Sequence, residues 1–183
     1  MNGLSEEVRG ITPAQFELLI DEQGAKIHNF CKMLTKSRAD ADDLYQDAFL
    51  QSYKLLHRIE IHNNPSSFII TVAVRLWKSK QRKTARRMSI LQQIEIPEFE
   101  IADPAPYLED LAVKKEIADL IRKCTDELPE KMRLAILLFY SGGLTIKEIA
   151  KEMRVPEGTI KSRLNTAKRK LKERLEEYGY ESY

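Results

Sequence analysis

The sequence is poor in the features that would indicate an exported, membrane-embedded or metal-dependent protein. It contains only 2 cysteines and 3 histidines, and Cys31 and Cys124 lie too far apart to predict a zinc site or a disulfide framework. We expect both thiols to be buried and unpaired, as in a cytoplasmic protein. No apolar run approaches the roughly 20 residues that a membrane-spanning helix needs. The opening residues, MNGLSEEVRG, lack an apolar signal segment, so we expect neither membrane insertion nor export.

Glycine and proline are also scarce, with 7 of each among 183 residues, which is unlike a low-complexity chain. Hydrophobic residues make up 43% of the sequence and charged residues 32%, so the chain can fill a core and cover its surface. No useful length alternates between apolar and polar residues, so we expect no strands. The sequence therefore predicts an all-α protein, of a length that suits one large or two small domains.

The net charge of +2 hides an uneven distribution of charged residues. Residues 75–87 contain seven basic and no acidic side chains, and residues 146–174 contain ten basic against four acidic ones. Between them, residues 95–110 contain six acidic side chains and no basic ones. Two basic modules separated by an acidic connector are typical of a chain with two nucleic-acid contacts. Solvated helix faces would also produce basic runs, although two such runs on periodic helices favour the first interpretation.

Apolar residues recur at three- and four-residue spacings over most of the chain, which predicts amphipathic helices. We expect them at about residues 13–34, 41–58, 65–87, 108–123, 129–140, 146–153 and 157–175. Residues 88–107 hold three prolines and much of the acidic cluster, and proline disfavours helix in the residue before it. We interpret this segment as a flexible linker between two small helical domains, residues 1–87 and 108–183.

Residues 144–164 have the pattern of a helix-turn-helix. The small side chain of Ala150 would let a second helix cross closely over the first, and Val155 would fill the turn. In the second helix Ile160, Leu164 and Ala167 follow one another at four- and three-residue steps, which buries one side. The other side is polar and basic, which suits the major groove of duplex DNA. An ordinary helical hairpin would share the apolar pattern, but not the turn and the outward chemistry together with it.

Residues 155–164, VPEGTIKSRL, resemble the promoter −35 reading helix of sigma-70 family factors, above all the V-P-x-G-T-V-K-S-R pattern of the extracytoplasmic-function (ECF) group. Residues 128–133, LPEKMR, are similar to the L-P-x-x-x-R opening of the same domain. Arg154 stands where the group usually has glycine in a left-handed turn, which predicts a cost of about 1 kcal/mol. The resemblance implies −35 contacts by Pro156, Glu157, Gly158, Thr159, Lys161, Ser162, Arg163, Asn165, Thr166, Lys168 and Arg169.

Residues 40–49, DADDLYQDAF, resemble the D-A-E-D-L-x-Q-E-x-F segment of sigma region 2. On a helix, one face would carry Asp40, Asp43, Gln46 and Asp47. By the resemblance, this face docks on the coiled coil of the polymerase β′ subunit. Acidic groups near a helix N-terminus also stabilise the helix itself, which is the simpler explanation. No His or Cys joins these carboxylates at ligand spacing, which argues against metal or acid–base chemistry.

Residues 67–75, SFIITVAVR, are similar to the W-L-x-x-I-A-x-N segment with which the family reads and melts the −10 element. Melting needs cations for the backbone and a pocket for an unstacked base. The turn at residues 61–66 corresponds to the loop that captures a flipped base. The sequence departs from the family at Phe68, Arg75 and Ser79, where Trp, Asn and Asp are usual. The candidate residues for the −10 element are His62, Asn63, Asn64, Phe68, Arg75, Lys78, Arg82 and Lys83.

The resemblance as a whole predicts an ECF sigma factor, with region 2 at residues 1–87, a linker at 88–107 and region 4 at 108–183. It implies binding to core RNA polymerase, at the β′ coiled coil and the β flap, and recognition of promoter DNA. It also implies an anti-sigma factor, able to hold this cytoplasmic protein near the membrane. The alternative is a stand-alone helix-turn-helix regulator that binds half-sites as a dimer. Without a Gly-rich phosphate loop or a metal-ligand motif, we expect neither an enzyme nor a cofactor.

Overall fold

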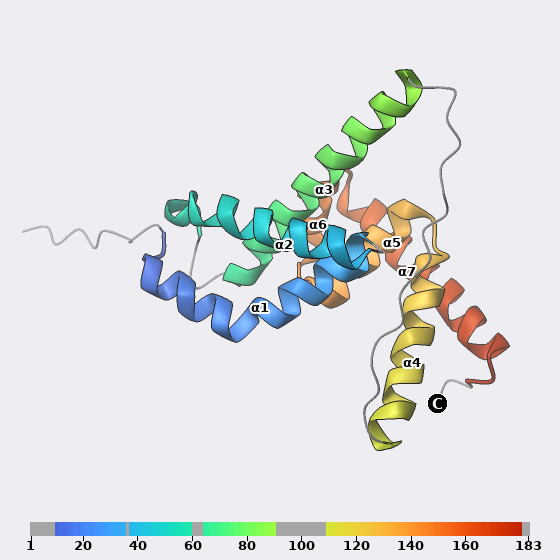
Figure 1. The fold of residues 1–183 in the computed structure, drawn as a ribbon. Coiled ribbons are helices and arrows are strands. Elements are labelled where there is room, and N and C mark those ends of the chain that lie inside the picture. Colours follow the sequence, from blue (N-terminus) through green and yellow to red (C-terminus); the bar gives the residue numbers. More distant parts are fainter. Residues whose placement is uncertain (1–9, 36, 60–63, 91–108, 181–183) are drawn as a thin grey trace, which may run out of the picture. The chain divides into compact units, whose positions relative to one another are not determined.

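The computed structural model describes residues 10–35, 37–59, 64–90 and 109–180, with side chains except at 88–90 and 109–116. Helices joined by short turns account for nearly all of these residues, and no strand occurs among them (Figure 1). The all-α prediction is therefore confirmed. The chain divides into two units, Met1–Ile94 and Glu95–Tyr183. Most of the expected linker, residues 91–107, lies outside the described residues, whereas its first residues belong to the end of a helix.

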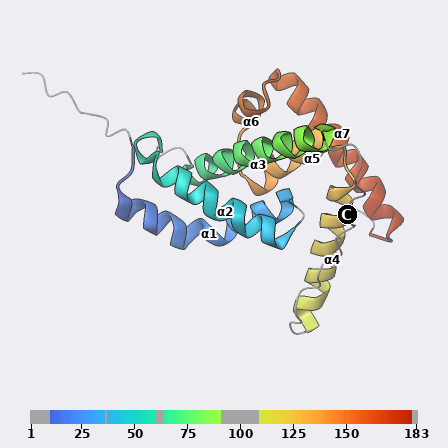
Figure 2. The same cartoon turned by 45° about the horizontal axis from the view of Figure 1, so that its top comes forward.

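In its described residues, the N-terminal unit contains three α-helices: α1 (Pro13–Thr35), α2 (Arg38–Tyr53) and α3 (Pro65–Ile90). Each packs on the other two (Figure 2). Phe16, Ile27, Phe30, Leu44, Ile69 and Ala73 are among the side chains of its core. A capping box opens α1, since the Thr12 N–H donates to Gln15 Oε1 at 2.8 Å and the Gln15 N–H donates to Thr12 Oγ1 at 3.2 Å.

The second helix ends earlier than the sequence indicated. The prediction carried it to about residue 58, but α2 ends at Tyr53 and a separate 3-10 turn, η1 (Leu56–Arg58), follows. The N–H groups of Arg58 and Ile59 donate to carbonyls three residues back, at 2.8 and 3.1 Å. This tighter path brings Ile59 into the core, where it is fully buried. Burial of Ile59 therefore decides where the regular helix stops.

The C-terminal unit contains α4 (Glu109–Asp126), α5 (Glu130–Ile136), α6 (Ile146–Met153) and α7 (Glu157–Glu177). The expected helix at residues 129–140 is interrupted, because α5 passes into a π-helical turn, η2 (Leu137–Ser141). Gly142 closes this turn, and a Cβ atom there would lie 2.6 Å from the Leu138 carbonyl oxygen. Gly143 then takes a φ of 68°, which favours glycine, and ends the segment.

Both cysteines are buried and unpaired, as predicted. Burial raises the pKa of the Cys31 thiol to about 12, so this thiol stays protonated at neutral pH. Burial also raises the pKa of Cys124. In the part of the chain that the structure describes, no helix has the length and apolar character needed to cross a membrane.

Candidate nucleic-acid and partner interfaces

The turn between α6 and α7 has the geometry of a helix-turn-helix. A capping box fixes the start of α6, where the Thr145 N–H donates to Glu148 Oε2 at 2.7 Å and the Glu148 N–H donates to Thr145 Oγ1 at 3.3 Å. Arg154 ends the helix with φ 54° and ψ 49°, so a left-handed turn is made here without glycine, as predicted. The Val155 N–H closes the turn by donating to the Ala150 carbonyl at 3.1 Å.

The inner side of α7 is buried as its spacing predicted. Ile160 and Ala167 have no exposed surface, and Leu164 is buried. On α6, Ile149 is fully buried and the small Ala150 nearly so, and the two helices pack on each other. An apolar contact therefore fixes the rotation of α7 about its own axis, and this rotation decides which side chains face outward.

Most of the residues that the sequence predicted for the −35 element lie on the outer side of α7, and Pro156 lies just before the helix. None of them is buried. Half-buried are Thr159, Arg163 and Thr166. Exposed are Pro156, Glu157, Gly158, Lys161, Ser162, Asn165, Lys168 and Arg169. The polar surface of the second helix thus lies where a partner can reach it.

Small uncharged residues line the middle of this outer side in the first half of α7. At 100° per residue, the positions opposite the buried row are occupied by Gly158, Ser162 and Asn165. Basic residues border this strip, with Lys161 and Lys168 on one side and Arg163 and Lys170 on the other. Ion pairs lie further along the helix, from Arg169 to Glu173 at 3.9 Å and from Lys172 to Glu176 at 3.7 Å. As far as Lys170, α7 therefore combines a neutral strip with cationic edges.

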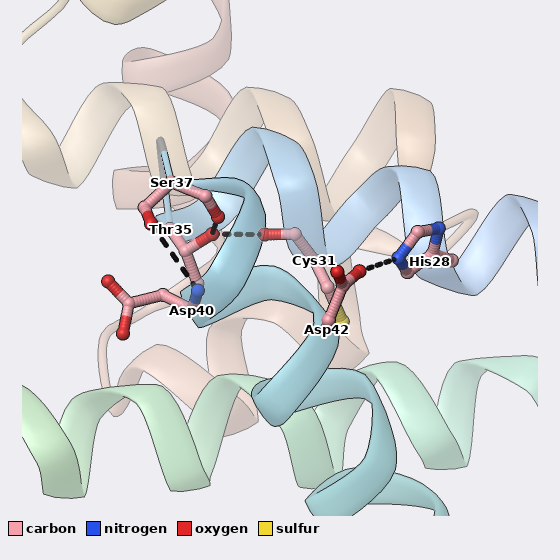
Figure 3. Close-up of polar contacts among 6 residues, drawn as sticks. All are labelled: His28, Cys31, Thr35, Ser37, Asp40 and Asp42. Atoms are coloured by element: carbon pink, nitrogen blue, oxygen red, sulfur yellow. Dashed lines mark hydrogen bonds and ion pairs between the residues drawn. The ribbon is translucent and has the colours of Figure 1, made fainter. Parts of the chain in front are cut away.

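The acidic face predicted on α2 consists of two parts. Asp40 lies at the start of the helix, where its N–H donates to the Ser37 hydroxyl at 3.3 Å (Figure 3). Its carboxylate pairs with the ammonium group of Lys80 on α3. The hydrogen bond that Lys80 donates to Asp40, and then the charges of Asp40, Asp43 and Asp47, raise the pKa of Lys80. Asp40 is half-buried and its carboxylate is paired with Lys80 of α3. The exposed residues of this face are Asp43, Gln46 and Asp47.

Two large apolar residues that the sequence analysis did not select continue the exposed part of α2. Leu50 is 59% exposed and Tyr53 is 47% exposed. They follow Asp43, Gln46 and Asp47 at helical spacings of three and four residues. That spacing was available in the sequence and could have identified them. The result is one exposed stripe that is acidic at one end and apolar at the other.

A second acidic residue of α2, Asp42, pairs with α1. Its Oδ1 lies 2.6 Å from His28 Nε2, as Figure 3 shows. The hydrogen bond from His28 lowers the pKa of Asp42. The His28 ring also meets Tyr45 edge-on, with 5.3 Å between the ring centroids. The pair thus connects α1 to α2 beside the acidic stripe, and no pattern in the sequence predicted it.

The −10 candidates gather along α3 and at its start. Asn64, just before the helix, is exposed with a φ of 47°, and its Oδ1 accepts a hydrogen bond from the Ser66 hydroxyl at 2.7 Å. Phe68 and Lys78 are half-buried, while Arg75, Arg82 and Lys83 are exposed. His62 and Asn63 lie outside the described residues. Among the residues that are described, no three metal-binding side chains come together.

Comparison with known families gives two matches in the same order as the two units. Residues 19–87 match the family described as Sigma-70 region 2. Residues 118–171 match the family described as Sigma-70, region 4. The first match covers most of α1 to α3, and the second covers the end of α4, α5, the helix-turn-helix and most of α7.

Curated relatives match over nearly the whole chain. The ECF RNA polymerase sigma factor SigW of Bacillus subtilis is 25% identical over 165 residues, covering 87% of this chain and 88% of the relative. The ECF RNA polymerase sigma-E factor of Escherichia coli K12 is 27% identical over 178 residues, covering 94% of this chain and 93% of the relative.

Two solved structures share the fold. The sigma factor RpoE of Bartonella quintana, crystallised with the anti-sigma factor NepR, has a TM-score of 0.70 at 23% identity, covering 88% of this chain and 97% of that one. CnrH in complex with the cytosolic domain of CnrY has a TM-score of 0.59 at 16% identity, covering 90% of each chain. The two domain matches and the named relatives show that the chain belongs to the sigma-70 family and, within it, to the ECF group of sigma factors, which are not enzymes themselves but direct RNA polymerase in transcription initiation.

Proposed function

We propose that this ECF sigma factor binds core polymerase through the exposed stripe of α2, grips the opened −10 element with α3, and reads the −35 duplex with α7. The proposal requires no cofactor and no catalytic centre in this chain. The observation that carries it is the rotation of α7, which buries Ile160 and Leu164 and leaves Lys161 and Ser162 exposed.

The two edges and the neutral strip of α7 fit the major groove. Ser162 and Asn165 offer donors and acceptors for base edges from the middle of the helix. The cations Lys161 and Arg163, on opposite edges, suit the phosphates of the two strands. Gly158 supports this orientation, because a Cβ atom added there would meet nothing within 4 Å. Since the space around it would accept a side chain, the fold does not require glycine here, and we propose that DNA approaches closely at this point.

The polymerase contact that we propose uses Asp43, Gln46 and Asp47 together with Leu50 and Tyr53. An acidic stripe that continues into exposed apolar side chains suits a partner helix with basic and apolar groups. The β′ coiled coil is that partner in the family, and the β flap is the corresponding partner of the C-terminal unit. Asp40 contributes indirectly, because Lys80 already occupies its carboxylate.

The −10 contact that we propose runs along α3. Asn64 stands before the helix with an amide that can pair with a base edge, and Phe68 offers a ring for stacking. Arg75, Lys78, Arg82 and Lys83 supply cations for the strand backbone. His62 and Asn63 are proposed as part of the same base-capturing turn.

We also propose that an anti-sigma factor holds the free protein inactive in the cytoplasm. One of the two solved structures with this fold is described as a complex with the anti-sigma factor NepR, and the other as a complex with the cytosolic domain of CnrY. Exposed apolar residues such as Leu50 and Tyr53 would suit a regulatory protein that competes with polymerase for this chain.

Run-off transcription from a promoter library, with purified core polymerase and with or without this protein, tests the proposal. We expect transcripts that start at a defined set of promoters and that depend on the protein. A set of promoters that is unchanged when the protein is left out would contradict the proposal. Tight binding of the free chain to the same promoters as a dimer would instead support a stand-alone regulator, and a gel shift without polymerase measures this.

A further inference from the structure

The π-helical turn η2 holds an exposed aromatic residue beside the recognition helix. Tyr140 is 54% exposed, although it is a large and mainly apolar side chain. The Phe139 ring meets it edge-on, with 5.0 Å between the ring centroids. The turn is built around Gly142, where a side chain would strike the Leu138 backbone. Since π-helical turns are frequent at functional sites, the exposure of Tyr140 calls for a role.

The neighbour of Tyr140 across the fold is Lys168 of α7. The Lys168 ammonium lies 5.5 Å from the centroid of the Tyr140 ring, within the range of a cation–π interaction. Lys168 is exposed and stands on the same edge of α7 as Lys161. A lysine side chain has four rotatable bonds and samples many rotamers. An aromatic ring under the ammonium group restricts the number of rotamers that the lysine samples, and it leaves the charge available to an anion.

We infer that Tyr140 is a positioning residue that holds the Lys168 ammonium against a phosphate of the −35 duplex. The inference rests on the proposed function, because it assigns Lys168 to the DNA-facing edge of α7. Tyr140 lies outside the helix-turn-helix, and its proposed effect on DNA binding comes from its contact with Lys168 rather than from a contact with a base.

The test compares four variants of the full chain in holoenzyme, on a promoter identified by run-off transcription. Lys168→Gln should lower the slope of log affinity against log salt by about one, as expected when one phosphate contact is lost. Tyr140→Leu should weaken promoter binding about two- to fivefold, the effect of an exposed cation–π interaction. Tyr140→Phe keeps the ring and should bind like the parent. The double variant Tyr140→Leu with Lys168→Gln should bind no more weakly than Lys168→Gln alone.

Tyr180→Leu removes another exposed tyrosine of this unit and serves as the matched control, with thermal melting of every variant. Unchanged binding of Tyr140→Leu, or additive losses in the double variant, would overturn the inference. A loss in Tyr140→Phe as large as in Tyr140→Leu would assign the effect to the hydroxyl and overturn it as well. If Lys168→Gln changed neither promoter affinity nor its salt dependence, Lys168 would not contact DNA and the inference would be wrong. Lys161→Glu tests the proposed function separately.

Discussion

The two units display their charges in different ways. In the N-terminal unit the acidic helix α2 packs on the basic helix α3, and Asp40 and Lys80 form an ion pair between them. In the C-terminal unit the first half of α7 packs on apolar residues of α6, and its polar side faces outward. A charged run in a sequence therefore predicts an available surface best when the neighbouring helix contributes apolar groups. Where the neighbour carries the opposite charge, part of the run is used within the fold.

The largest effect that would test this contrast is expected at Lys161. Lys161→Glu reverses an exposed charge at the edge of α7, so we expect promoter binding by holoenzyme to fall by about 1–3 kcal/mol, roughly fivefold to 150-fold. Core binding should not change, because the residue lies on α7 and the proposed stripe lies on α2. Lys26→Glu, at an exposed position of α1, is the matched control. Parent-like promoter binding by Lys161→Glu would show that this side of α7 does not face DNA.

A smaller effect should separate the two parts of the acidic face. Asp43→Lys should weaken core binding about tenfold, the loss of roughly 1.4 kcal/mol from an interface residue. Asp40→Lys should weaken it less, because the Asp40 carboxylate is already paired with Lys80. Titration of labelled core polymerase measures both, with Asp21→Lys on α1 as the control. Equal losses for Asp40→Lys and Asp43→Lys would show that both residues contact polymerase directly.

The turn of the helix-turn-helix offers a gain in stability rather than a loss. Arg154 adopts a left-handed conformation, which is strained for a residue with a side chain and unstrained for glycine. We therefore expect Arg154→Gly to raise the free energy of unfolding by up to about 1 kcal/mol. Lys151→Gly, on the exposed side of α6, should lower it by about 1 kcal/mol, because there glycine only adds flexibility. Chemical denaturation measures both. A destabilised Arg154→Gly would mean that the Arg154 side chain contributes more than its backbone costs.

The smallest expected effect concerns the pair between α1 and α2. His28 lowers the pKa of Asp42, so the pair stabilises the fold above the ordinary carboxyl pKa of 3.8 and loses this contribution as the pH falls through the lowered value. Asp42→Asn should therefore have a lower melting temperature than the parent at pH 7. The difference between the two melting temperatures, the gap, should narrow below pH 3.8. His28→Gln should behave alike. A gap that stays constant across this range would mean that the Asp42 charge does not contribute to stability.

Most helices could be predicted because their apolar spacing is regular. The start of α3 at Pro65 and both bounds of α6 agree with prediction, since proline and the Thr145 capping box are local signals. The end of α2 and the break after Ile136 were not predicted. Each depends on a distant or unusual requirement, the burial of Ile59 in one case and the closure of a π-helical turn at Gly142 in the other.

The outward side of α7 was predictable from one helix alone, because burial of Ile160, Leu164 and Ala167 leaves a single orientation. The partners of charged residues could not be predicted from one helix. The contacts of Asp40 with Lys80, of Asp42 with His28 and of Lys168 with Tyr140 join helices that are remote in sequence. The −10 and −35 contacts of individual residues remain predictions.

The sequence by itself determined the helical class, the order of the two units and the apolar rows, because periodicity and capping are properties of short segments. The tertiary structure alone decided which charges stay exposed and which are paired, since that depends on the neighbour that packing brings across each helix. Asp40 and Asp43 make the distinction plain, because they lie three residues apart on one helix and, among the described residues, Lys80 of α3 forms an ion pair with the first and not with the second.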